Sequence, residues 1–356
     1  PVENLIGKRG EGFRIALNIL HMGRMKLGAN VIGAAKETIT LSVKYANERK
    51  QFNSLIANFG AIKYKLAEQV IRCFAHESAT YRVSRDIDIL LDKYLAEGCD
   101  KGKATIDAIA HYAVEDAILK VYGSEMLDYV ADEGVQIHGG MGYSAEMNVE
   151  RAYRDSRINR IFEGTNEINR LLVTEAATKR SLKGDYDLFG PAEELYNKLD
   201  SISECSCSCK KEGEGYFDEK QRYIKSLKKV IMLLTHVANK QFGKKFMAEQ
   251  EVVNNITNII MDTYLAESLA LRVAKLEKIK GGDIQVYKDM VDVFLFDAAG
   301  RTRKSAMDAI YSSTEGDEAC KLAKAIDTLT CQAGVNVMAA RRRIADKLIE
   351  DNQYKF

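Results

Sequence analysis

Proline is almost missing from this chain. Only two of its 356 residues are proline, and one of these is the first residue. Proline inside a helix removes a backbone donor and clashes with the preceding turn, so a chain this poor in proline can form very long helices. Hydrophobic residues make up 46% of the sequence and charged residues 29%, which is the balance of a globular protein. We therefore predict an all-α fold.

Apolar residues recur at three- and four-residue spacings over most of the chain, which is the period of an α-helix. The helices that we predict in the first half cover residues 11–48, 58–97, 103–137 and 166–182, with a short one from about 148. Long antiparallel helices joined by short turns are typical of an up-and-down bundle. The glycine-rich stretch 139–143 interrupts this period, and we expect it to form a loop that is not helical.

A second helical region follows a boundary at 183–191 that is rich in glycine and aspartate. We predict a short helix over 192–199 and then long helices over 217–354, interrupted by a glycine pair near residue 281. The stretch 205–215 reads as a polar, irregular linker. Because it has no amphipathic apolar face, we do not expect it to bind a membrane firmly.

Charge and cysteine content argue against several classes of protein. Basic and acidic residues nearly cancel, 52 against 51, whereas a nucleic-acid-binding protein needs a clear cationic excess. The seven cysteines are odd in number and mostly dispersed, which favours reduced thiols in the cytoplasm or, in a eukaryote, the mitochondrial matrix. Cys205, Cys207 and Cys209 alternate with serines and lack the spacing of a zinc site, so we predict no metal.

The strongest local pattern surrounds Glu163, which follows Ile161 and Phe162 and precedes a glycine. A carboxylate held against apolar surface has its charged form disfavoured, and this suits it to act as a general base. Thr165 or Asn166 would cap the following helix by accepting a hydrogen bond from a free amide. A glutamate in a turn between helices is more often simply solvated, and the residues alone leave both interpretations open.

Two further groups could bind an anionic ligand. Gln136 shortly precedes the glycines of 139–142, and clustered glycines at a helix end expose amides to a phosphate or a ring. The spacing of a Rossmann turn is absent, and an ordinary glycine-rich turn explains them equally well. Arg49 stands where the first long helix ends and could pair with a phosphate, although the helix dipole also favours an exposed arginine there. Arginine recurs at every third residue over 151–160, where a solvated face is the simpler interpretation.

The order of these motifs resembles that of one enzyme family. The chain carries E-R-x-Q-F from Glu48, Q-I-x-G-G-x-G-Y from Gln136, E-R-x-x-R-D-x-R-I from Glu150 and E-G-T-N-E-I from Glu163. This set closely resembles the acyl-CoA dehydrogenase family over residues 1 to about 182. The stretch 58–60 and the long C-terminal extension resemble the very-long-chain branch of that family.

The resemblance implies an active site with three kinds of residue. Glu163 would be the catalytic base that removes the α-proton of an acyl-CoA thioester, while its backbone amide helps to hold and polarise the thioester carbonyl. The residues that match substrate-contacting positions are His21, Arg24 and Gly164. The residues that match FAD-contacting positions are Arg49, Gln136, Gly139, Gly140, Thr165, Asn166 and Glu167. In the family, Arg49 and the Gln136 loop reach the FAD of the neighbouring subunit, which implies a homodimer.

The resemblance also implies a domain division and partners. Residues 1–12 would be the end of the family's middle β-domain or a linker, 13–185 the C-terminal helical bundle, and 190–356 an additional helical domain. The chain would then be a fragment, inactive by itself, of an enzyme of fatty acid β-oxidation. That enzyme would convert acyl-CoA to trans-2-enoyl-CoA and pass electrons to an electron-transferring flavoprotein.

Two alternatives remain open at this point. An acyl-CoA oxidase would use the same base with oxygen as the electron acceptor. A non-enzymatic helical assembly module would retain Glu163 without using it. The chain also departs from the family in two places. Gly60 stands where medium-chain members have a glutamine that contacts FAD, and the helical hairpin over 86–109 is longer than in long-chain relatives.

Overall fold

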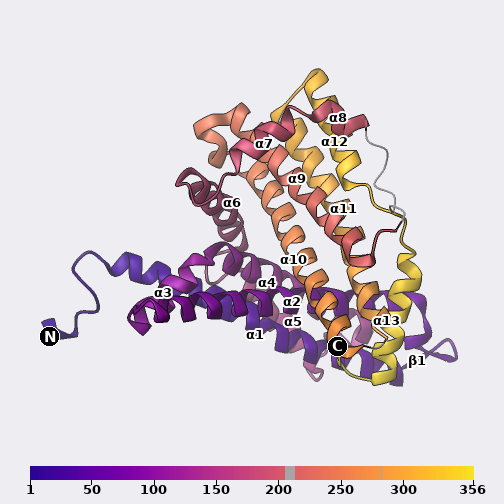
Figure 1. Cartoon of the computed structure of the whole chain (residues 1–356). Coiled ribbons are helices and arrows are strands. Elements are labelled where there is room, and N and C mark those ends of the chain that lie inside the picture. The colour runs from indigo at the N-terminus through magenta and orange to yellow at the C-terminus, as the bar shows by residue number, and fades with distance from the viewer. Residues whose placement is uncertain (205–212, 282) are drawn as a thin grey trace.

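The computed structural model describes residues 1–204, 213–281 and 283–356 (Figure 1). Within these residues the protein has thirteen α-helices and one short two-stranded hairpin, so the predicted all-α fold is confirmed. Most of the predicted linker over 205–215, including its three cysteines, lies outside the described residues. Among the helices of the described part, none is both long and apolar enough to cross a membrane.

Four helices form the layer that carries the candidate site. They are α1 (Gly12–Glu48), α2 (Gly60–Ala96), α3 (Lys101–His111) and α4 (Ala113–His138). The prediction of one helix over 103–137 is wrong, because the chain leaves the helical conformation at Tyr112 (φ −97°, ψ 24°). A single residue outside the helical region can turn the helix axis without interrupting the apolar period, so the sequence pattern does not show the break.

The segment after α4 is more regular than the sequence predicts. Gly139 (φ +61°) ends α4, but η3 (Gly139–Tyr143) is a 3₁₀-helix, so the prediction of a non-helical loop is wrong. A glycine in this conformation ends the α-helical bonding pattern, while shorter turns still form, as between the Ser144 amide and the Met141 carbonyl (3.0 Å). The elements that follow are α5 (Asn148–Ser156), η4 (Arg157–Arg160) and α6 (Asn166–Leu182).

The second half of the described chain is helical as predicted. Its elements are α7 (Phe189–Tyr196), α8 (Leu199–Glu204), α9 (Tyr216–Phe242), η5 (Gly243–Ala248), α10 (Gln250–Lys280), α11 (Gln285–Ser313), α12 (Gly316–Thr330) and α13 (Val337–Asp351). The short helix predicted over 192–199 begins earlier, and Pro191 lies in the first turn of α7. Backbone amides of the first turn have no acceptor within the helix, so a proline, which lacks the amide hydrogen, is tolerated there.

A few short elements complete the chain. The 3₁₀-helix η1 (Val2–Asn4) lies near the start. The strands β1 (Lys50–Gln51) and β2 (Ser54–Leu55) pair antiparallel, and with η2 (Ile56–Asn58) they connect α1 to α2.

Helices α9, α10 and α11 rise from the layer formed by α1, α2 and α4 (Figure 1). One hydrophobic core runs from this layer into the second half, and it includes Phe74 of α2 and Leu265 of α10, both fully buried. Arg341 of α13 also donates to Glu68 of α2 (2.8 Å). The domain boundary near residue 190 stays a prediction, and the helices on either side of it share this core.

The cysteines differ from the prediction at one position. Cys73, Cys99 and Cys320 are free thiols, and burial raises the pKa of the Cys73 thiol to about 12. Cys331, which follows α12, is disulfide-bonded, so the prediction of reduced thiols is wrong there. Dispersal along the sequence does not reveal which cysteines meet in space, because a disulfide depends on the distance between their backbones.

Two glycines allow α1 and α4 to pack closely. A Cβ at Gly28 of α1 would lie 2.9 Å from Leu119 Cβ, and a Cβ at Gly123 of α4 would lie 2.6 Å from the His76 ring. His76 is fully buried between these helices, and its Nε2 donates to the Gly28 carbonyl (2.7 Å). This contact fixes the helix that carries His21 and the residues around it.

Stability is expected to depend on pH through His76. Burial lowers the pKa of this imidazole to about 4, from an ordinary value of 6.5. Between these values the unfolded chain binds a proton that the folded chain does not, so stability falls as the pH drops from 6.5 to 4, by about 3 kcal/mol in all. His76→Gln removes this contribution. Denaturant unfolding of both proteins across this pH window should therefore give diverging stability curves, and parallel curves would contradict the prediction.

Candidate functional site

The turn between η4 and α6, residues 161–165 and here called the Glu163 turn, holds Glu163 in an unusual backbone conformation. Glu163 (φ 58°) and Gly164 (φ +80°) both occupy the left-handed region. Glycine adopts this region freely, whereas a glutamate stays there only when its surroundings hold it. Thr165 then caps α6, since its hydroxyl accepts a hydrogen bond from the Ile168 amide (3.4 Å).

The carbonyl groups of this turn are held by side chains from three helices. Arg24 Nε of α1 donates to the Glu163 carbonyl (3.1 Å), and Lys120 Nζ of α4 donates to the Gly164 carbonyl (2.7 Å). The side-chain amide of Asn169 in α6 donates to both of these carbonyls and to the next one along the chain (3.3, 2.7 and 3.0 Å). Within the described chain, no group accepts a hydrogen bond from the backbone amides of Glu163 and Gly164, so these amides remain available to a ligand.

The Glu163 side chain lies against Gly23 of α1. A Cβ at Gly23 would come within 2.5 Å of Glu163 Oε2 and 2.8 Å of Oε1, so only glycine leaves room for the carboxylate in this position. Ile161 and Phe162 are 48% and 44% exposed, and they give the turn an apolar rim. One residue therefore presents a half-buried carboxylate and a free amide beside apolar surface.

Charged side chains lie buried beside this turn. Arg24 is 5% exposed, and burial lowers the pKa of its guanidinium, an effect that Glu163 and Asp116 oppose. Burial raises the pKa of Asp116 to about 8, and neither of its carboxyl oxygens has a partner in the described structure. His21 contacts Arg24 (3.4 Å), and burial lowers the pKa of its imidazole. The structure thus gathers His21, Arg24 and Gly164 around Glu163, although their contact with substrate stays a prediction.

Three of the predicted cofactor-contacting residues, Thr165, Asn166 and Glu167, lie at the start of α6, and their side chains have different surroundings. The hydroxyl of Thr165 is used as the helix cap. Asn166 is buried, and its side chain bonds to Lys120 (2.7 Å) and Ser124 (3.0 Å), which leaves only its backbone for a ligand. Glu167 is exposed, and hydrogen bonds from its own backbone amide and from the Thr165 hydroxyl lower the pKa of its carboxyl.

The other four predicted cofactor-contacting residues gather at the opposite ends of α1 and α4. They are Arg49, Gln136, Gly139 and Gly140, here called the Arg49 group. All but Gln136 line a hollow of about 550 Å³, in which the ring of Tyr45 stacks on that of His138 (4.2 Å between centres). Gln136 is exposed on the last turn of α4. A Cβ at either glycine would meet no atom within 4 Å, so their backbone is open to approach.

The two groups of candidate residues are far apart within one chain. Gly23, which lies against Glu163, and Arg49 are separated by the rest of α1. At 1.5 Å per residue this separation is about 39 Å. The structure therefore brings together the residues around Glu163 and, separately, the residues around Arg49, but it does not bring these two groups to each other.

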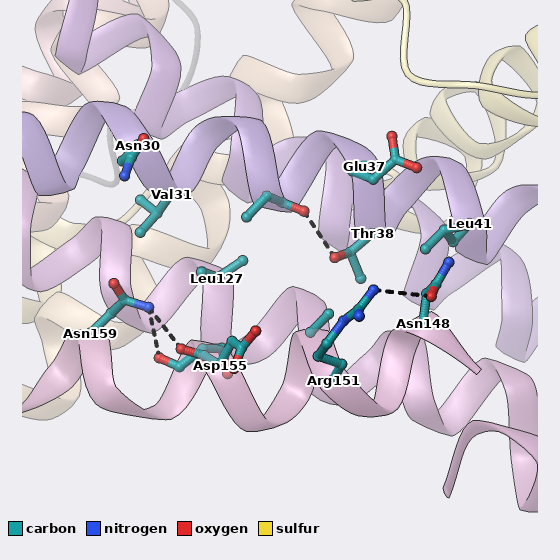
Figure 2. A pocket seen from close by; sticks show the side chains of 13 residues that line it. Asn30, Val31, Glu37, Thr38, Leu41, Leu127, Asn148, Arg151, Asp155 and Asn159 are labelled. Carbon is teal, nitrogen blue, oxygen red and sulfur yellow. Dashed lines mark hydrogen bonds between the residues drawn. The ribbon is translucent and has the colours of Figure 1, made fainter. Parts of the chain in front are cut away.

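A further hollow of about 370 Å³ lies between α1, α4 and α5 (Figure 2). Several of its polar side chains bond within their own helix or turn. Arg151 turns to Asn148 of its own helix (3.3 Å), and Asn159 donates to the carbonyls of Asp155 and Ser156 (3.2 and 3.1 Å). Because these groups satisfy one another, we do not assign a ligand to this hollow.

The arginines that recur over 151–160 do not form one binding surface. Arg151 lines the hollow of Figure 2, whereas Arg154 and Arg157 line a different one. Arg160 pairs with Asp128 of α4 (3.4 Å). Their separation agrees with the simpler interpretation of a solvated face.

Three residues of this site, Lys120, Asn169 and Asp116, are not predicted from the sequence. Lys120 stands between apolar neighbours in 118–121, and a lysine in such a run is a signal of a buried ammonium that needs partners. Asn169 and Asp116 carry no such signal, because their neighbours in the sequence do not predict which loop they face.

Comparison with known proteins agrees with the motifs. Two family models, both described as the acyl-CoA dehydrogenase C-terminal domain, match residues 10–178 and 226–326. A probable acyl-CoA dehydrogenase of Bacillus subtilis is 38% identical over 355 residues, or 99% of this chain and 59% of that protein. The very long-chain specific mitochondrial acyl-CoA dehydrogenase of Rattus norvegicus is 38% identical over 202 residues, or 57% of this chain and 28% of that protein.

A solved structure matches the whole fold. The acyl-CoA dehydrogenase of Bacillus anthracis, crystallised in complex with FAD, aligns with a TM-score of 0.94 and 37% identity over 100% of this chain and 60% of that one. The chain thus spans about three fifths of the length of both Bacillus relatives. The matches include both halves of the chain, the Glu163 turn and the Arg49 group. The chain belongs to the acyl-CoA dehydrogenase family.

Proposed function

We propose that the protein is an FAD-dependent acyl-CoA dehydrogenase, which converts acyl-CoA thioesters to trans-2-enoyl-CoA with Glu163 as the base. The observation that carries this proposal is the Glu163 turn, where one residue offers a carboxylate beside Gly23 and a free backbone amide. An α-proton next to a carbonyl becomes removable when a donor binds the oxygen on which charge develops. The amide can supply that donor while the carboxylate accepts the proton.

The atoms balance as an α,β-dehydrogenation. The α-carbon loses a proton to Glu163, its electron pair forms the new double bond, and the β-carbon gives up a hydride. FAD, when bound, accepts that hydride. The chain's own contribution is orientation, because buried Arg24 holds the Glu163 carbonyl and the exposed rings and methyls of Ile161 and Phe162 offer an apolar surface to an acyl chain.

The residues present fit FAD as the bound group. Exposed Arg49 and the open backbone of Gly139 and Gly140 suit a phosphate-bearing nucleotide. Thr165, Glu167 and the backbone of Asn166 would contact the group from the side of the Glu163 turn, and Gln136 from the side of Arg49. The FAD complex of the Bacillus anthracis relative supports this assignment.

We further infer a homodimer from the separation of about 39 Å along α1 between Gly23 and Arg49. One dinucleotide cannot span both groups of a single chain. The Arg49 group of one chain would therefore contact the FAD that lies beside Glu163 of a second copy. If the FAD-loaded protein sedimented as a monomer, this two-subunit site would be wrong.

The electron acceptor and pathway follow from the same proposal. The protein would act in fatty acid β-oxidation and pass its electrons to an electron-transferring flavoprotein. The names of its relatives, which include a very long-chain specific dehydrogenase, support an acyl-CoA substrate. An acyl-CoA oxidase would differ only in the acceptor, because it would return its electrons to oxygen.

Anaerobic reduction of the bound flavin tests the proposed function. We expect the flavin absorbance of the full-length, FAD-loaded protein to bleach when acyl-CoA is added without oxygen, and to do so fastest at one range of chain length. The reduced flavin should then persist in air longer than that of an oxidase. A flavin that binds and stays oxidised with thioesters from short to very long chains would overturn the proposal and favour a helical assembly module.

A further inference from the structure

We propose that Lys120 is a positioning residue for the Glu163 turn, whose buried ammonium fixes the turn's carbonyl side to α4 and so directs the Glu163 carboxylate and amide toward substrate. This inference rests on the proposed function and deepens it. It concerns a residue that cannot touch the substrate, since the Lys120 side chain is fully buried.

The contacts of Lys120 are unusual for a buried lysine. Its Nζ donates to the Gly164 carbonyl and to Asn166 Oδ1, each at 2.7 Å. Both acceptors are neutral oxygens, and no carboxylate in the described chain forms an ion pair with this ammonium. Burying an ammonium without a carboxylate partner is costly, so a simple structural role would be served better by an apolar side chain. Burial, together with nearby Arg24, lowers the pKa of Lys120 to about 8.

The backbone of the turn needs such a support. Glu163 and Gly164 are successive residues with positive φ, and a non-glycine residue holds this conformation only when its surroundings determine it. Lys120 holds the Gly164 carbonyl, so the peptide that joins Gly164 to Thr165 cannot rotate freely, and this fixes the backbone directly after Glu163. The Glu163 carboxylate is thereby kept in its position against Gly23.

Lys120 differs from the two other groups that bind these carbonyls. Asn169 belongs to α6, which directly follows the turn that it supports, so it does not tie the turn to another helix. Arg24 lies at a predicted substrate-contacting position and can act on the ligand as well. Lys120 comes from α4, which packs closely on α1 through Gly28, and α1 carries Gly23. It therefore ties the base to the same scaffold against which the base is placed.

The test uses two substitutions in the full-length, FAD-loaded protein. Lys120→Met keeps the length of the side chain but removes every donor, and Lys120→Gln keeps one donor group. Anaerobic stopped-flow reduction is measured with the acyl-CoA that bleaches the unaltered protein fastest. We expect Lys120→Met to lower the limiting reduction rate per bound FAD about 10- to 100-fold, as for a base displaced by about 1 Å. The apparent Kd of the thioester should change by less than about threefold, and Lys120→Gln should recover part of the rate.

A matched control separates positioning from general anchoring. Ser124 of α4 also bonds to Asn166 but touches no carbonyl of the turn, so Ser124→Ala should reduce within about twofold of the unaltered rate. The inference is overturned if Lys120→Met loses FAD or thermal stability while its rate per bound FAD is unchanged, or if Ser124→Ala is equally slow. Should Lys120→Met fail to fold, Lys120→Gln decides in the same way. An unaltered protein that no thioester bleaches would instead contradict the proposed function itself.

Discussion

Glu163→Gln is expected to lower the rate of flavin reduction by acyl-CoA about 10²- to 10⁴-fold, which is the contribution of a general base. Glutamine has the same length, and it leaves the turn and its carbonyl contacts in place. It cannot accept the α-proton at neutral pH. FAD and the thioester should therefore still bind, and anaerobic stopped-flow absorbance should show a flavin that stays oxidised for far longer after mixing.

The matched control for this variant is Glu175→Gln. Glu175 lies in the same helix α6, where it pairs with Lys179 (2.5 Å) on the surface and faces no part of the candidate site. It should reduce at the unaltered rate. If Glu163→Gln reduced as fast as Glu175→Gln with FAD bound in both, Glu163 would not be the base, and another carboxylate would have to take the proton.

Gly23→Ala is expected to slow flavin reduction about 10- to 100-fold while leaving the protein at least as stable as before. The new Cβ would stand 2.5 Å from Glu163 Oε2, so the carboxylate must swing away from the position that we assign to catalysis. A displacement of about 1 Å at a reacting group can cost about 10²-fold in rate. Stability should not fall, because the clash is with the flexible end of a side chain and alanine favours a helix over glycine by about 1 kcal/mol.

Gly33→Ala is the control for this substitution. Gly33 lies in the same helix, and a Cβ there would meet no atom within 4 Å. Both variants should therefore gain helix stability in thermal unfolding, and only Gly23→Ala should lose reduction rate. Equal reduction rates in the two proteins would show that the carboxylate does not act from the position against Gly23.

Most of the fold could be predicted because the signals for it are local. The helix predicted over 11–48 is α1 at Gly12–Glu48, and the one over 166–182 is α6 at Asn166–Leu182. Apolar period, caps and scarce proline act within a few residues of each helix. The break at Tyr112 is not predicted, because one residue can leave the helical conformation without changing the apolar period on either side of it.

The candidate site was predicted less completely than the fold, because several of its contacts join residues that are far apart in the sequence. The resemblance predicts Glu163, Arg24 and the Arg49 group as site residues. In the structure Glu163 lies half-buried in a turn, and the Arg49 group lies at the far ends of α1 and α4. Arg24 is buried beside Glu163. Lys120 and Asn169 were not predicted. The apolar neighbours of Lys120 indicate a buried ammonium, but the sequence does not show that Lys120 and Asn169 both bind the Gly164 carbonyl, because a backbone carbonyl carries no sequence signal.

The sequence by itself determined that this chain is helical, that a glutamate precedes a glycine and a helix cap at 163–165, and that an arginine ends the first long helix. Only the tertiary structure decided that the Glu163 carboxylate lies against Gly23, more than a hundred residues earlier, and that the Arg49 group is too far from it to share one ligand. The reason is physical. Helix period and capping depend on neighbours in the chain. The contacts of Glu163 depend instead on how closely α1, α4 and α6 pack, and small residues and buried polar groups determine that packing only once the helices are in contact.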